Sequence, residues 1–183
     1  MRKLVEIAGF QVTWLALVWG AANGRIWFGL AAAVIFLTAH LVAHRDGAAS
    51  QLIFLTEAAA FGFLVDSLLV LAGAISFPPK SQLGWPATIW MAALWACFAA
   101  ALSGPLRWLA DSPRMAIAFG LAGGPLAYYI GSRMGALVLG PAGPIVLVLI
   151  AGEWALAMPV LVLLLRLRRL QTAPAPRTSG ACP

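Results

Sequence analysis

The chain has 183 residues, of which 62% are hydrophobic and only 10% are charged, and its mean hydropathy is +0.93. Soluble domains carry about 25% charged residues, so this composition indicates an integral membrane protein without a sizeable soluble domain. The net charge of +6 does not point to a nucleic-acid partner, because the basic residues lie scattered at the ends of apolar runs. The two cysteines, Cys97 and Cys182, predict neither a disulfide framework nor a thiolate metal site.

Six apolar runs, each long enough to cross a bilayer, follow one another along the chain. They cover Leu4–Ala22, Ile26–Ala43, Leu52–Ile75, Ala87–Leu106, Met115–Leu139 and Pro144–Leu165. Gly, Pro and polar residues gather at the breaks, as turns require. The first run has the outline of a secretory signal, but Glu6 and Gln11 interrupt it and the next run follows closely, so we interpret it as a span. The sequence therefore predicts an all-α bundle of about six transmembrane helices over residues 1–170.

The distribution of basic residues predicts the orientation of this bundle. An even number of spans puts both termini on one side, where most of the Lys and Arg residues also fall. The basic residues on that side are Arg2, Lys3, Arg45, Arg107, Arg114, Arg166, Arg168, Arg169 and Arg177; those on the other side are Arg25, Lys80 and Arg133. The positive-inside rule predicts cytoplasmic termini. Residues 171–183, rich in Pro, Ala, Thr and Ser, predict a disordered basic tail on the same side.

The fifth run combines a stripe of small residues with two larger polar side chains. At 100° per residue the stripe holds Gly120, Gly124, Ala127, Gly131 and Gly135. Such a face predicts close packing against another helix, either within the bundle or between copies of the chain in a homo-oligomer. Tyr129 and Arg133 project from the opposite side. Arg133 either reaches the lipid headgroups or, together with Tyr129, binds an anionic group inside the bundle.

Two carboxylic acids lie deep in predicted spans, where ionisable groups are costly and are functional candidates. Asp66 lies about 14 residues into the third run and Glu153 about ten residues into the sixth, so both fall near the middle of the bilayer. Such a pair can form a proton or cation site, but two separate hydrogen bonds that fix helix packing explain the residues equally well. A buried carboxyl must be protonated, hydrogen-bonded or paired, and Ser67 is a candidate partner for Asp66.

His40 and His44, the two histidines of the chain, share one helix face because they lie four residues apart. With Glu57 as a third ligand they can hold a metal ion, although histidines at a membrane interface are more often hydrogen-bonded. Arg45 is the alternative partner for Glu57. No cofactor is indicated, since the sequence contains no phosphate-binding loop, no Gly-x-Ser-x-Gly and no Cys-x-x-Cys motif.

Tryptophan occurs twice in a Trp-x-x-x-x-Trp spacing, as Trp14 with Trp19 and as Trp90 with Trp95. The spacing fits an interfacial tryptophan belt. It also fits a three-plus-three inverted repeat, an arrangement typical of secondary transporters, in which the two midplane acids occupy corresponding helices.

Three stretches carry a resemblance to a known family. They are FQVTWLALVWGAANG (Phe10–Gly24), PLRWLADSP (Pro105–Pro113) and GGPLAYYIGSRMGAL (Gly123–Leu137). Together they resemble the bacterial six-span inner-membrane family catalogued as domain of unknown function 2878, over nearly the whole chain. The resemblance implies a multi-pass protein of the bacterial inner membrane, and it implies no activity, cofactor or catalytic residue.

Three hypotheses of function stay open. The first is a small transporter or lipid-handling protein in which Asp66 and Glu153 line a midplane site and Arg133 with Tyr129 forms its mouth; it predicts a water-accessible cavity that reaches Asp66. The second is an integral-membrane enzyme that acts on lipid through the two histidines and Glu57. The third is an accessory subunit whose polar residues only specify helix packing. We favour the first, with membrane lipids and a small molecule or lipid as the expected partners.

Overall fold

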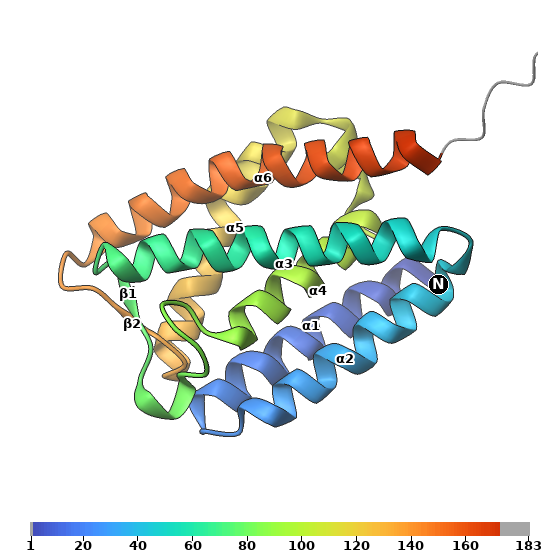
Figure 1. Ribbon diagram of the computed structural model, residues 1–183. Coiled ribbons are helices and arrows are strands. Elements are labelled where there is room, and N and C mark those ends of the chain that lie inside the picture. Colours follow the sequence, from blue (N-terminus) through green and yellow to red (C-terminus); the bar gives the residue numbers. More distant parts are fainter. Residues whose placement is uncertain (1, 173–183) are drawn as a thin grey trace, which may run out of the picture.

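The computed structural model describes residues 2–172, and these form a bundle of six α-helices (Figure 1). The helices are α1 (Arg2–Ala22), α2 (Ile26–Ala43), α3 (Ala48–Leu71), α4 (Ile89–Ser103), α5 (Pro113–Met134) and α6 (Pro144–Thr172). Three short 3-10 helices lie between them: η1 (Arg45–Gly47), η2 (Pro79–Ser81) and η3 (Arg107–Asp111). The all-α fold is thereby confirmed, and each of the six predicted apolar runs corresponds to one α-helix. The tail expected over residues 171–183 lies, from residue 173 on, outside the described residues.

Five of the helices are long and apolar enough to cross a membrane, whereas α4 has only 15 residues. The sequence predicts that this span continues to Leu106. Instead α4 ends at Ser103, because Gly104 leaves helical geometry (φ −102°, ψ −106°) and Pro105 has no backbone N–H to continue the helix. At 1.5 Å per residue α4 is about 22 Å long, and η3 occupies the remaining space at that end.

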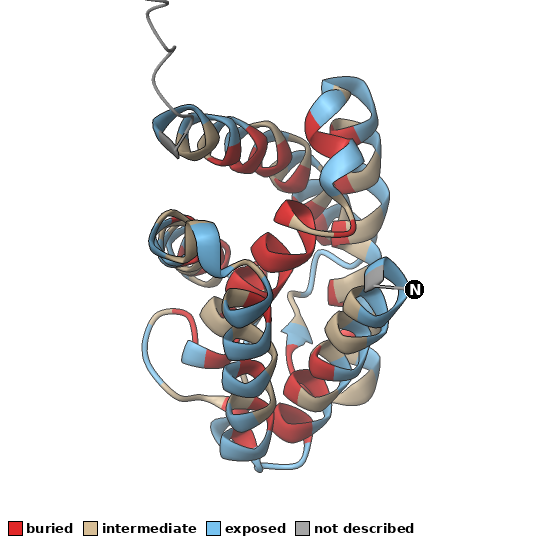
Figure 2. Ribbon diagram, turned by 90° about the vertical axis from the view of Figure 1, so that its right-hand side faces the viewer, coloured by how far each residue is buried: buried red, intermediate tan, exposed pale blue. Residues whose placement is uncertain are grey.

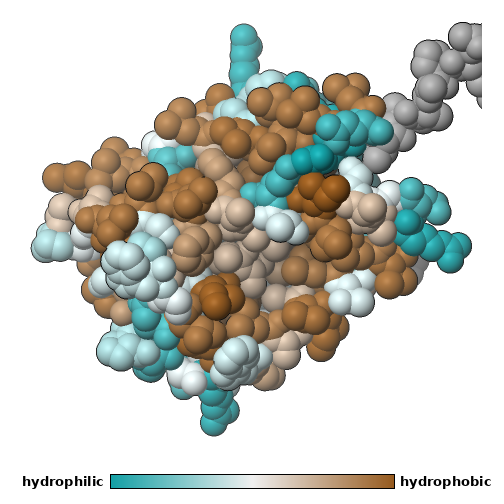
Figure 3. Space-filling model, in the orientation of Figure 1, coloured by the Kyte–Doolittle hydropathy of each residue, from teal (hydrophilic) through white to brown (hydrophobic). Residues whose placement is uncertain are grey.

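The short helix α4 is the core of the bundle. Eleven of its 15 residues are buried, and Figure 2 shows buried residues concentrated on the central helix. A helix that is apolar all round is expected at such a position. The longer helices around α4 keep one side apolar and exposed, as at Trp27, Ile35 and Leu156. Hydrophobic side chains accordingly cover much of the face seen in Figure 3, as helices in contact with lipid require.

The small-residue stripe of α5 packs against α6. A Cβ atom added to Gly120 would lie 2.5 Å from the carbonyl oxygen of Trp154, and one added to Gly124 would overlap the Trp154 indole. Close packing is therefore confirmed for these two glycines, and its partner is a helix of the same chain. Gly135 does not belong to the stripe, because it ends α5 in the left-handed conformation (φ 84°).

Different contacts tie the two ends of the bundle together. We call the end that carries the α1–α2, α3–α4 and α5–α6 connections the hairpin end. There β1 (Ile75–Ser76) pairs antiparallel with β2 (Val138–Leu139), which joins the α3–α4 connection to the α5–α6 connection. At the terminal end, where the N-terminus and the last turns of α6 lie (Figure 1), Glu57 is paired with Arg168, whose Nε donates to Glu57 Oε2 at 3.0 Å. The expected pairing of Glu57 with Arg45 is wrong, because α6 passes beside α3 at this point.

Candidate functional site

Asp66 lies in the last third of α3, five residues before the helix ends at Leu71, and has no exposed surface. Its Oδ2 accepts a hydrogen bond of 2.9 Å from Nε1 of Trp95 in α4, and its Oδ1 accepts one from the hydroxyl of Tyr128 in α5. Tyr128 is itself only 4% exposed. One carboxyl group therefore joins three helices at the centre of the bundle, and two donors satisfy it there.

Two expectations about Asp66 are wrong. Ser67 is not its partner, because the Ser67 hydroxyl donates to the carbonyl oxygen of Phe63 at 2.6 Å and accepts from the N–H of Ala87. The cavity that the transport hypothesis predicts does not reach Asp66, because packed side chains enclose this residue completely. A path for ions or substrate through Asp66 would require a different arrangement of the helices.

Glu153 of α6 belongs to the same cluster as Asp66. Its carboxyl group interacts electrostatically with both Asp66 and Tyr128. Both of its carboxyl oxygens are buried, and neither has a hydrogen-bond partner within residues 2–172. Leaving a buried polar group without a partner costs free energy, so this carboxyl is a place where a proton or a ligand group can bind. We call Asp66, Glu153, Tyr128 and Trp95 the acid cluster.

Aromatic packing holds the Trp95 N–H against Asp66. The indole of Trp95 stacks on that of Trp154 with ring centroids 4.5 Å apart and planes 15° apart, and Phe61 contacts it edge-on at 6.1 Å. Gly62 lies one helical turn before Asp66 on the same face, and a Cβ atom there would overlap the Trp95 ring. Glycine at this position lets the indole approach α3 closely enough to donate to Asp66.

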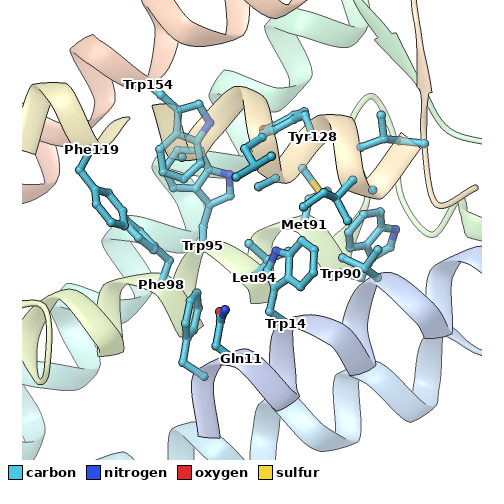
Figure 4. A pocket seen from close by; sticks show the side chains of 18 residues that line it. Gln11, Trp14, Trp90, Met91, Leu94, Trp95, Phe98, Phe119, Tyr128 and Trp154 are labelled. Carbon is cyan, nitrogen blue, oxygen red and sulfur yellow. The ribbon is translucent and has the colours of Figure 1, made fainter. Parts of the chain in front are cut away.

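A groove with a cavity of about 220 Å³ lies beside the acid cluster, between α1, α4 and α5 (Figure 4). Its walls are largely aromatic and include Phe10, Trp14, Trp90, Phe98 and Phe119. Trp95, Tyr128 and Trp154 also line it, so the groove and the acid cluster share side chains. Leu126, 58% exposed, and the exposed Gln11 line it as well, which shows that the groove opens on the outer surface of the bundle. In a membrane this surface faces lipid.

Of the two adjacent tyrosines, Tyr128 contacts Asp66, whereas the sequence analysis proposed Tyr129 as a binding residue. Tyr129 is 46% exposed, and Arg133, one turn further, is exposed on the outside of α5, so the structure does not bring these two residues to the acid cluster. The signal that identifies Tyr128 is its position next to the glycine stripe, since it follows Gly124 by four residues and so turns toward the bundle.

The two histidines lie together, but Glu57 does not join them. His44 Nδ1 is 2.9 Å from the carbonyl oxygen of His40, the two rings lie 4.4 Å apart, and His40 Nε2 is 3.2 Å from the Ser103 hydroxyl. Glu57 instead binds Arg168. Within residues 2–172 no group of three or more His, Cys, Asp or Glu side chains is placed to hold a metal ion.

The tryptophans divide between core and surface. Trp90 and Trp95 are each 1% exposed, so the interpretation of this pair as interfacial belt residues is wrong. Trp19 fits that interpretation, because it is exposed near the end of α1 with the Arg25 guanidinium 5.7 Å above its ring. The Trp-x-x-x-x-Trp spacing therefore marked three residues that line the groove, Trp14, Trp90 and Trp95, but it did not indicate what the groove does.

Fold and site together define a polytopic α-helical membrane protein that keeps a hydrogen-bonded acid at its centre, next to an aromatic groove open to the side. A family model described as protein of unknown function (DUF2878) matches residues 3–160, and the chain belongs to this family. The matched region includes Asp66, Tyr128 and Glu153. No curated protein and no solved structure matches the chain.

Proposed function

We propose that this protein binds a lipid or another largely apolar molecule in the groove between α1, α4 and α5, and that Tyr128 couples occupancy of the groove to the acid cluster. The observation that carries the proposal is the position of one side chain. The ring of Tyr128 lines the groove while its hydroxyl donates to Asp66. A ligand that displaces the ring therefore acts directly on the buried carboxyl.

The lining of the groove supports an apolar ligand that enters sideways from the bilayer. Pockets for whole drug-sized molecules measure about 300–1,000 Å³, so a cavity of about 220 Å³ suits a segment of a hydrocarbon chain better than a complete lipid. Gln11 adds an amide on α1 that can hold a polar group of the ligand (Figure 4). The remaining part of the ligand then stays among the membrane lipids.

Coupling to the acid cluster follows from hydrogen bonding. Hydrogen bonds to charged groups contribute about 1.5–3 kcal/mol, and couplings between sites are commonly about 1–3 kcal/mol. Loss of the Tyr128 hydroxyl leaves Asp66 with the Trp95 N–H as its remaining donor in the acid cluster and removes the contact between the groove and this carboxyl. Lipid handling is favoured over transport through the midplane, because Asp66 is enclosed.

We also propose that the protein lies in the bacterial inner membrane with both termini in the cytoplasm. The terminal end of the bundle, which carries most of the basic residues, faces the cytoplasm by the positive-inside rule. Cysteine introduced at exposed Asp46, at the terminal end, is expected to be protected from an impermeant maleimide in intact cells, whereas cysteine at exposed Asn23, at the hairpin end, is expected to react. The reverse pattern would contradict the orientation.

Photo-crosslinking with a phospholipid that carries a diazirine in its acyl chain tests occupancy of the groove. Gly123 lines the groove, and a Cβ atom there would meet only the Phe119 ring at 3.6 Å, so Gly123→Leu fills the groove without a backbone clash. Gly152→Leu is the matched control, since nothing lies within 4 Å of Gly152 on the exposed side of α6. We expect adducts on the α1 and α5 groove segments that Gly123→Leu removes and Gly152→Leu leaves. Adducts that are spread evenly over the exposed helices and are unchanged by Gly123→Leu would contradict lipid binding in the groove. Helix packing would then be the role of the residues that line it.

A further inference from the structure

A second cavity, of about 680 Å³, lies at the terminal end of the bundle and shares no lining residue with the groove. The start of α1, the start of α3, the turn after α4, η3 and the last turns of α6 surround it. Its lining includes the polar side chains of Lys3, Glu6, His44, Gln51, Ser103, Arg107, Asp111 and Arg169. We call it the terminal cleft.

Three cations converge on the terminal cleft from three separate elements: Lys3 from α1, Arg107 from η3 and Arg169 from α6. The Arg169 guanidinium is partly removed from water, is repelled by the like charge of Arg107 and is attracted by the opposite charge of Asp111. Repulsion of this kind is relieved when an anion binds between the two guanidinium groups. A phosphate ester is the anion that guanidinium groups match best in geometry.

The same cleft also presents hydrogen-bond acceptors. The carboxyl groups of Glu6 and Asp111 line it, and so does Gln51, whose Oε1 is buried and has no hydrogen-bond partner within the described part of the chain. An unpaired buried amide oxygen requires a donor, and a phosphate supplies none. A primary ammonium group supplies three donors and the opposite charge to the two carboxylates.

We propose that the terminal cleft binds a phospholipid headgroup that carries both a phosphate and a primary ammonium, as phosphoethanolamine does. The phosphate lies between Arg107, Arg169 and Lys3, and the ammonium lies toward Gln51 and the carboxylates. The volume of the cleft falls within the about 300–1,000 Å³ typical of small-molecule sites. Trp108, which lines the cleft and is 48% exposed, is a residue type favoured at the membrane–water interface, where a headgroup lies.

Native mass spectrometry of the full chain tests this proposal. The protein is released from micelles that contain equal amounts of phosphatidylethanolamine, phosphatidylglycerol and phosphatidylcholine, and the retained lipid is weighed. Phosphatidylglycerol has the phosphate without an ammonium, and the trimethylammonium of phosphatidylcholine cannot donate hydrogen bonds. We expect phosphatidylethanolamine to be retained about tenfold over each of the others.

Two variants at exposed arginines of the terminal end distinguish binding in the terminal cleft from a general effect of positive surface charge. Arg107→Gln is expected to lower retention of phosphatidylethanolamine about tenfold, whereas Arg114→Gln, outside the cleft on α5, is expected to leave it unchanged. Gln51→Leu should reduce the preference over phosphatidylglycerol while keeping the fold. Gly123→Leu in the groove should change neither result. The proposal for the terminal cleft and the proposal for the groove can therefore be contradicted independently.

Three outcomes would overturn the proposal. Equal retention of the three lipids, or equal effects of Arg107→Gln and Arg114→Gln, would show that the cleft does not select a headgroup. Preference for phosphatidylglycerol that depends on Arg107 would show a simple anion site without the ammonium contact. Binding of soluble O-phosphoethanolamine, without retention of the corresponding lipid, would identify a free solute as the ligand.

Discussion

Tyr128 donates its hydroxyl to Asp66 across the bundle, between two residues that lie 62 positions apart in the chain, and its ring at the same time lines the groove. Both residues are buried, so neither can exchange this hydrogen bond for one to water. The bond therefore stabilises the packing of α5 against α3 and also connects the groove to a carboxyl group.

Replacing Tyr128 by Phe is expected to reduce the free energy of unfolding by about 1–3 kcal/mol, because it removes a donor from a buried acceptor. Unfolding in mixed micelles with increasing denaturing detergent measures the change. Tyr129→Phe is the control, since Tyr129 is exposed on the same helix. A double-mutant cycle with Asp66→Asn should give a coupling free energy of about 0.5–3 kcal/mol. Equal effects of the two tyrosine variants would contradict the hydrogen bond.

Adding one methyl group at Gly62 or Gly124 is expected to destabilise the protein by about 1–3 kcal/mol. A Cβ atom at Gly62 meets the indole of Trp95, and one at Gly124 meets that of Trp154, and these rings stack on each other. Gly152→Ala, where the new methyl meets nothing within 4 Å, should be neutral or stabilise by up to about 1 kcal/mol. Thermal unfolding in detergent measures all three, and tolerance of alanine at Gly62 would show that Trp95 does not lie against α3.

Replacing Glu153 by Met is expected to raise the free energy of unfolding by about 1–3 kcal/mol. Both carboxyl oxygens are buried without a partner in residues 2–172, and a side chain of similar size without polar atoms avoids that cost. The same denaturation assay, with Glu153→Gln for comparison, measures the effect. Destabilisation by Met would show that the carboxyl group has a partner in the membrane. Stabilisation accompanied by loss of lipid crosslinking would identify Glu153 as a residue kept for function at a cost in stability.

Much of the fold could be predicted from the sequence, because the hydrophobic effect acts on each span separately. Apolar runs broken by Gly, Pro and polar residues located the six helices, and helical periodicity located the face of α5 that packs on α6. The depth of Asp66 and Glu153 within their runs also identified the two acids that the structure brings into one cluster. The predicted length of α4 was too great at its C-terminal end, because Gly104 and Pro105 end the helix inside an apolar run.

Partners across the bundle could not be predicted in the same way. Trp95 and Tyr128 meet Asp66 because of how α3, α4 and α5 rotate about their axes, and Arg168 reaches Glu57 because α6 lies beside α3. Those rotations follow from the packing of large rings into small residues, as with Trp95 over Gly62, and no single helix contains that information. The groove depends on three helices and was missed for the same reason.

Labelling with dicyclohexylcarbodiimide in membrane vesicles is the most direct test of the connection between groove and acid cluster. This apolar reagent enters from the bilayer and modifies protonated carboxyl groups in apolar surroundings, and mass spectrometry locates the modified residue. The account predicts modification at Glu153, whose carboxyl oxygens have no hydrogen-bond partner in residues 2–172, at a rate that Gly123→Leu lowers and Gly152→Leu does not. Absence of labelling at Glu153, or labelling at the same rate in both variants, would show that the groove does not communicate with the acid cluster and would contradict the account.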